Sequence, residues 1–238
     1  MSPRWASLLA VLVLAAVHLL AGRRRPGREL DPGWLSAAAG VSIAYVFIHL
    51  LPVLSELQAS FLEERSRAAP WLREQVYLAA LFGLVAMYAL DHLASTRKAS
   101  VAGFWAHGGS FALYNAIIGY YAARLDRSVG IGLATGAFAA HFLVNDQALQ
   151  EAYGGLYQRY GRPLLSASVL AGWVLGTFVA LPQVALIALF SALAGGILLN
   201  SLKDELPEDR EGRLGPFVAG TVGYSGVLLA WFYALRGG

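Results

Sequence analysis

The chain has 238 residues, of which 57% are hydrophobic and 14% are charged, and its mean hydropathy is +0.54. This composition excludes an ordinary soluble domain, in which about 25% of residues are charged, and predicts a multi-pass membrane protein. The net charge of +3 does not indicate nucleic-acid binding, because the basic residues are scattered through short loops. The absence of Cys excludes disulfides and thiolate metal sites.

Apolar runs of roughly 20 residues predict the helices. We expect an all-α integral membrane protein with eight transmembrane helices in a single polytopic domain covering 1–238. The first run is followed by three Arg without a small-residue cleavage site, so we expect a retained anchor rather than a cleaved signal peptide. The predicted helices are 6–21, 33–53, 75–93, 101–122, 129–147, 164–181, 183–202 and 216–235.

The distribution of Lys and Arg predicts the topology. Basic residues are more numerous in the loops after the first, third, fifth and seventh helices than at the termini and in the other loops. The positive-inside rule therefore places both termini outside, and we expect a plasma (inner) membrane location. The segment 54–74 is the longest polar stretch and predicts a short amphipathic surface piece.

The second and seventh predicted helices share a spaced pattern. Ala39-Gly40 is followed after eight residues by His49-Leu50-Leu51-Pro52, and Ala194-Gly195 is followed after eight residues by Asp204-Glu205-Leu206-Pro207. Because these two spans run in opposite directions, the match has the form of an inverted repeat around the fourth and fifth helices. The alternative is coincidence, since glycine and proline are frequent in membrane helices.

Polar residues inside the fourth and fifth predicted helices are the main candidate site. His141 and Asn145 are four residues apart and share a helix face, with Asp146 about 100° round the helix. His107 and Asn115 lie on roughly one face of the fourth helix. Imidazole, amide and carboxylate groups suit zinc, iron or manganese. Interhelical hydrogen bonding by His and Asn is the alternative interpretation.

Other polar residues mark a transport pathway along the second and seventh helices. His49 ends the second helix and is expected to line an exit, or else to be an amphipathic side chain at the headgroup level. Asn200 precedes Asp204 and Glu205, which are expected to be a transport carboxylate pair or the first solvated residues of an acidic loop.

Two further positions are predicted to be interfacial. His18 and the pair Asp91-His92 stand at span borders, where such side chains are more often interfacial than ligands. Glycines in the sixth and eighth helices are spaced to form small-residue seams against neighbouring helices. They are Gly172, Gly176, Gly215, Gly220, Gly223 and Gly226.

The chain resembles the ZIP (Zrt/Irt-like protein) family of divalent metal transporters over nearly its whole length. The residues His49 to Pro52 and Gly195 to Pro207 are similar to the family motifs that end its second and seventh helices. His141 to Asp146 resembles the motif of its fifth helix, and Phe111 to Ala116 aligns with that of its fourth. The resemblance implies eight spans in a 3+2+3 arrangement with an inverted repeat and both termini outside.

The resemblance also implies a function and a set of ligands. The leading hypothesis is divalent metal cation transport, with zinc the first candidate and no organic cofactor or enzyme activity. Carried over position by position, the metal ligands would be His141, Asn145, Asn115 and Asp146. The expected partners are the lipid bilayer and the metal ion, with no nucleic acid; a homodimer and a monomer are both open.

Departures from the family motifs support two alternatives. Phe111, Ala112 and Phe142 stand where the family has metal ligands, which favours a transport-deficient ZIP-fold protein with a binding or regulatory role. A third, last-ranked hypothesis is an intramembrane metal-dependent hydrolase using His141 and Asp91, although no His pair at helical spacing supplies the three ligands that catalytic zinc needs.

Overall fold

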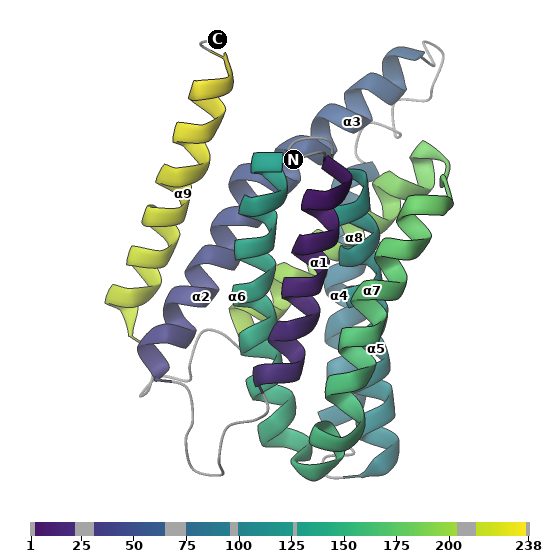
Figure 1. Ribbon diagram of the computed structural model, residues 1–238, viewed down its shortest axis with the longest axis vertical. Helices are drawn as coiled ribbons and strands as arrows, with labels where there is room; N and C mark the ends of the chain where they lie inside the picture. Colours follow the sequence, from purple (N-terminus) through teal and green to yellow (C-terminus); the bar gives the residue numbers. More distant parts are fainter. Residues whose placement is uncertain are drawn as a thin grey trace.

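A computed structural model describes residues 3–21, 31–64, 75–95, 100–125, 128–203 and 213–236. Within these ranges all the regular structure is helical (Figure 1), which confirms the expectation of an all-α fold. The helices are α1 (Pro3–Ala21), α2 (Pro32–Tyr45), η1 (Val46–Leu50), α3 (Leu51–Glu64), α4 (Gln75–Ser95), α5 (Val101–Arg124), α6 (Ser128–Tyr153), η3 (Tyr157–Gly161), α7 (Arg162–Phe178), α8 (Gln183–Lys203) and α9 (Leu214–Arg236).

Each predicted helix has a counterpart, but two extend well beyond the predicted ends. The second predicted helix continues through η1 and α3 to Glu64, so 54–64 is helical and not a loop. Leu54 and Gln58 are buried on one side of α3, and the Gln58 Oε1 accepts a hydrogen bond from the Val76 amide at 2.8 Å. The fifth predicted helix continues as α6 to Tyr153. Tertiary contacts thus prolong helices past the apolar runs that predicted them.

Two π-helical turns each occur just before a proline. The turn η1 ends two residues before Pro52, and η3 ends two residues before Pro163. Proline has no N–H to donate and crowds the carbonyl four residues earlier, so a regular α-helix cannot continue unchanged through it. The wider turn absorbs this conflict without breaking the rod.

The helices pack in pairs through close backbone approaches. The tightest pairs are α5 with α7, α2 with α9, and α4 with α8, while α1 lies against both α6 and α7. Figure 1 shows α9 at one edge of the molecule beside α2. A Cβ atom on any of six glycines would overlap the backbone of the partner helix, and these form the pairs Gly119 with Gly172, Gly40 with Gly220, and Gly83 with Gly195. This confirms the predicted small-residue seams at Gly172 and Gly220, and Gly176 also lies close to the α5 backbone. The prediction is wrong for Gly215, Gly223 and Gly226, where an added Cβ meets nothing within 4 Å because these positions face away from α2.

The outer surface carries many large apolar side chains. Phe82 of α4, Phe178 of α7 and Tyr233 of α9 are each more than two-thirds exposed. Among the described residues, three helical stretches are long and apolar enough to cross a membrane, Pro32–Glu56, Gln183–Asn200 and Leu214–Ala234. Two shorter apolar helices, Arg4–Leu20 and Val76–Leu90, accompany them. An apolar exterior of this kind is compatible with membrane association.

Candidate functional site

A chain of three polar side chains crosses the bundle interior from α6 through α1 to α5. The His18 Nδ1 lies 2.8 and 3.0 Å from the two carboxylate oxygens of Asp146. The Asn115 Nδ2 lies 2.9 Å from the His18 Nε2. His18 and Asp146 are each only 1% exposed, and Asn115 is equally well buried. The polar network is therefore defined as Asp146, His18 and Asn115.

The hydrogen bonds fix the roles of the two imidazole nitrogens. The Asn115 amide nitrogen is a donor, so the His18 Nε2 accepts and the proton stands on Nδ1. Nδ1–H then donates to the Asp146 carboxylate in a charge-assisted hydrogen bond. Burial and the nearby Asp146 carboxylate both raise the pKa of the Tyr157 hydroxyl, which lies just beyond α6.

Hydrogen bonds from α7 fix the position of α1 along its axis, which places His18 in the polar network. The Arg162 Nε donates to the His18 carbonyl at 3.3 Å, and the Ser166 Oγ donates to the Ala15 carbonyl at 2.9 Å. Two turns further along α7, the Trp173 Nε1 donates to the Ser7 Oγ at 3.0 Å. Three hydrogen bonds along one seam fix the axial position of α1, and with it the His18 imidazole.

The prediction that His18 is an interfacial residue is wrong. His18 stands one turn before the end of α1, but α5, α6 and α7 continue past that end. Figure 1 shows α1 stopping short of the turn that joins α6 to α7. The end of an apolar run predicts where a helix ends. Whether a residue near that end is buried depends on how far the neighbouring helices extend past it. No spacing signal within α1 itself identifies His18 as a partner of Asp146.

The predicted pair on α6 does form a second polar contact. The Asn145 Nδ2 donates to the His141 Nε2 at 2.9 Å, as their four-residue separation predicts. Asn145 is 3% exposed, and its Oδ1 has no hydrogen-bond partner among the described residues. A buried acceptor without a donor is unfavourable by about 1–3 kcal/mol. This oxygen of the predicted ligand set is therefore open to an incoming donor or cation.

Two aromatic side chains, Phe142 and Phe111, lie at positions for which the resemblance implied metal ligands, and both are buried. Phe142 is fully buried, and its ring is stacked on the His18 imidazole with centroids 4.3 Å apart. Phe111 is buried in a separate apolar cluster with Tyr153 and Leu149. Phe142 therefore closes the apolar wall around His18, and neither ring offers an atom that can bind a metal ion.

The remaining predicted site residues lie elsewhere. His107 faces Tyr153, whose hydroxyl is 3.4 Å from the His107 Nδ1, so it does not join the Asn115 network as a ligand. His49 is buried between the rings of Tyr45 and Trp231, and its Nδ1 has no hydrogen-bond partner among the described residues. Asn200 is buried in α8. The predicted carboxylate pair Asp204 and Glu205, and the side chain of Asp91, lie outside the described residues.

The described part of the chain contains no group of three His, Cys, Asp or Glu side chains close enough to hold a metal ion. The structure joins a carboxylate, an imidazole and an amide from three helices in the polar network, and an imidazole and an amide of α6 in a second contact. Such groups can exchange hydrogen bonds or bind a cation with the help of amide oxygens. The fold and the site thus define a class, an α-helical bundle with an apolar exterior and a buried ionisable network. No protein-family model matches this chain, and no curated protein matches it.

Proposed function

We propose that the protein is an eight-span integral membrane protein of ZIP-like architecture, with both termini outside the plasma membrane. The apolar exterior and the three long apolar helices support membrane insertion. The pairing of helices supports the ZIP-like arrangement, because the contact of α1 with α6 corresponds to that of α7 with α5, and the contact of α2 with α9 corresponds to that of α8 with α4. These correspondences are those of a 3+2+3 inverted repeat with α5 and α6 in the middle.

The glycine seams that join α2 to α9 and α8 to α4 have the same register. Gly40 of α2 faces the carbonyl three residues before Gly220 and the amide one residue after it. Gly195 of α8 faces the carbonyl three residues before Gly83 and the amide one residue after it. The match of Ala39-Gly40 with Ala194-Gly195 seen in the sequence is therefore accompanied by matching partners in three dimensions. Gly119 of α5 has the same register against Gly172 of α7, so the register is common to the glycine seams and the pairing of the helices carries the argument for the repeat.

The activity that we propose is the transport of a divalent metal cation, of the zinc, iron or manganese class, as substrate. The observation that carries it is the unpartnered Oδ1 of Asn145, buried beside His141. Rotation of the amide by half a turn would present Oδ1 and the His141 Nε2 to the same ion, and each is a suitable ligand atom. Ionisable and polar residues within membrane bundles are functional-site hypotheses by default, because burying them in lipid is unfavourable.

The polar network has a defined role in this proposal. Asp146 lies directly after Asn145 and supplies the negative charge that would favour a cation in the bundle interior. His18 donates to that carboxylate and satisfies it when no cation is present, and Asn115 orients the His18 imidazole. Alternating access would then require α1, with the α7 seam that holds it, to move against α6.

Metal uptake into proteoliposomes tests the proposal. Purified protein is reconstituted and offered zinc, iron, manganese and cadmium in turn, and uptake is compared with that of empty vesicles. We expect uptake of at least one ion and its loss in His141→Ala. The matched control is His92→Ala, which removes an exposed His at the end of α4 and should leave uptake unchanged. Equal uptake by His141→Ala and the unmodified protein would overturn the site assignment.

A second candidate is a transport-deficient ZIP-fold protein with a binding or regulatory role. Its specific support is that Asp146 is already hydrogen-bonded to His18 and that Phe142 covers the imidazole. In this case the polar network ties α1, α5 and α6 together, as interhelical hydrogen bonds do in other membrane bundles. Elemental analysis and calorimetry that detect no bound metal, together with no uptake of any ion, would favour this candidate.

A further inference from the structure

A groove of about 570 Å³ runs along the outside of the molecule between α2 and α6. Its volume is within the range of about 300–1,000 Å³ that is usual for pockets that hold small ligands. The groove is on the outer side of α6 and does not include any member of the polar network. It therefore has to be explained separately from the proposed transport site.

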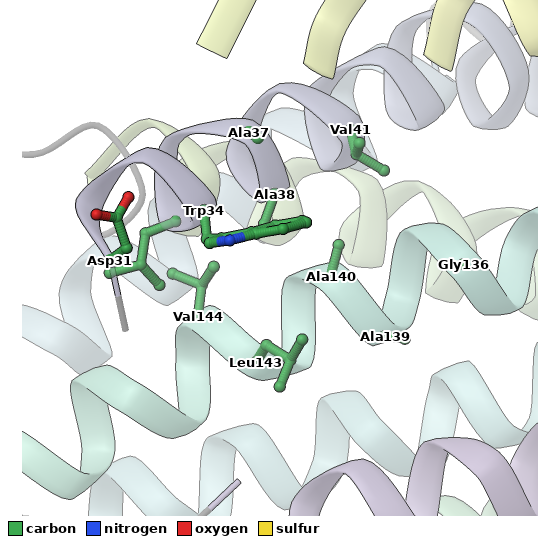
Figure 2. Close-up of a pocket in the computed structure, with 11 residues that line it drawn as sticks. Asp31, Trp34, Ala37, Ala38, Val41, Gly136, Ala139, Ala140, Leu143 and Val144 are labelled. Carbon is green, nitrogen blue, oxygen red and sulfur yellow. The ribbon is translucent and has the colours of Figure 1, made fainter. Parts of the chain in front are cut away.

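Small side chains give the groove its width. Ala37 and Ala38 line it from α2, and Gly136, Ala139 and Ala140 line it from α6. Figure 2 shows the Trp34 ring projecting from the start of α2 into the space in front of Ala140 and Val144. Trp34 is 75% exposed, although an indole ring of this size is normally largely buried. An apolar occupant lying in the groove would cover this ring.

Opposite charges meet at one end of the groove. Asp31 lines it and is also the N-cap of α2, where its Oδ1 accepts a hydrogen bond from the Gly33 amide. The Arg213 Nη1 lies 3.6 Å from the same oxygen. Both side chains are more than half exposed, so each retains a side that is open to a ligand. The apolar groove is thus lined at one end by the Asp31 carboxylate, and the Arg213 guanidinium lies beside that carboxylate.

We propose that the groove binds an aminophospholipid, with one acyl chain between α2 and α6 and its headgroup at Asp31 and Arg213. The headgroup carries a phosphate and a primary ammonium, which complement the guanidinium and the carboxylate respectively. Trp34 occupies the position between the charged end and the apolar floor, which is the level that indole rings prefer in membranes. This inference depends on membrane insertion as proposed above, but not on metal transport.

The charge arrangement favours an aminophospholipid over the other occupants of such a groove. A lipid with a purely anionic headgroup would meet Arg213 but would place its negative charge beside Asp31. A diacylglycerol would fill the apolar part and leave the charged end unused. A second copy of the chain would have to insert a narrow apolar ridge into a concave groove and bring a cationic and an anionic group to the same end.

Native mass spectrometry of the full chain in mild detergent tests this assignment. The probes are phosphatidylethanolamine, phosphatidylglycerol and diacylglycerol with identical acyl chains. The blocking variant is Gly136→Leu, which fills the groove from α6 at a position where an added Cβ meets only ordinary contacts. The matched control is Gly132→Leu, one turn earlier on α6. An added Cβ there meets nothing within 4 Å, and Gly132 does not line the groove.

We expect one retained phosphatidylethanolamine, held more tightly than the other two probes, and its loss in Gly136→Leu but not in Gly132→Leu. Asp31→Asn keeps the helix cap but removes the charge, and should weaken phosphatidylethanolamine by about tenfold while leaving diacylglycerol unchanged, as for the loss of one charge-assisted hydrogen bond. Equal retention of all three lipids, equal behaviour of the two glycine variants, or a dimer that excludes lipid would each overturn the proposal. Because retention is measured without metal, failure of metal uptake leaves this test intact.

Discussion

The hydrogen bond between His18 and Asp146 gives the sharpest test of the structure. His18→Leu and Asp146→Leu, alone and together, form a double-mutant cycle around one buried contact. Each single variant leaves a buried polar group facing an apolar side chain, whereas the double variant removes both groups. We therefore expect the two single variants together to lose more unfolding free energy than the double variant loses.

The magnitude follows from the geometry of the contact. A hydrogen bond to a charged group contributes about 1.5–3 kcal/mol, compared with about 1 kcal/mol for an ordinary one. Hydrogen bonds between neutral groups in a membrane bundle average about 0.6 kcal/mol. The His18 Nδ1 lies within 3.0 Å of both carboxylate oxygens, and both residues are almost completely buried. We expect a coupling energy of about 1.5–3 kcal/mol.

Unfolding in mixed micelles, with denaturing detergent titrated and helicity followed by circular dichroism, measures the four free energies. The Asn115 amide loses its acceptor in both variants that lack His18, so that contribution cancels in the cycle. The matched control cycle uses His107→Leu and Tyr153→Phe, whose contact is 3.4 Å long and less buried. A coupling energy for His18 and Asp146 no larger than that of the control would refute the buried charge-assisted pair.

Three further predictions follow from the packing and the proposed topology. Gly220→Leu should lower the unfolding midpoint strongly because its Cβ overlaps the α2 backbone, while Gly223→Leu, whose Cβ meets nothing within 4 Å, should not; equal midpoints would contradict the seam. Pro52→Ala restores the N–H that an α-helical turn needs, so η1 should relax and α3 should rotate by about 100°. A Cys pair at Gln58 and Val76, in contact across α3 and α4, should then cross-link less efficiently, and unchanged cross-linking would mean that packing alone holds the π-turn. The chain has no native Cys, so single Cys residues at Ser100 and Gln183 should be labelled from opposite sides of the membrane if the proposed topology is correct.

Helix existence could be predicted from the sequence because it depends on local physics. Long apolar runs must form helices wherever water cannot satisfy the backbone, and every run of that kind corresponds to a helix in the structure. The contact of His141 with Asn145 was also predictable, since both residues are on one helix and their spacing fixes their separation. Small size at helical spacing identified the seam glycines Gly172 and Gly220, but it did not distinguish them from Gly223, whose Cβ would meet nothing within 4 Å.

Only the tertiary structure determined which helices pack together and how each is positioned along its axis. The partner of Asp146 is His18, which is 128 positions away in the sequence, and no pattern within either helix refers to the other. His18 is buried because α1 ends beside longer neighbours and is held there by Arg162 and Ser166 of α7. A periodicity tells which face of a helix is polar, but the pairing of two such faces is a property of the assembled bundle.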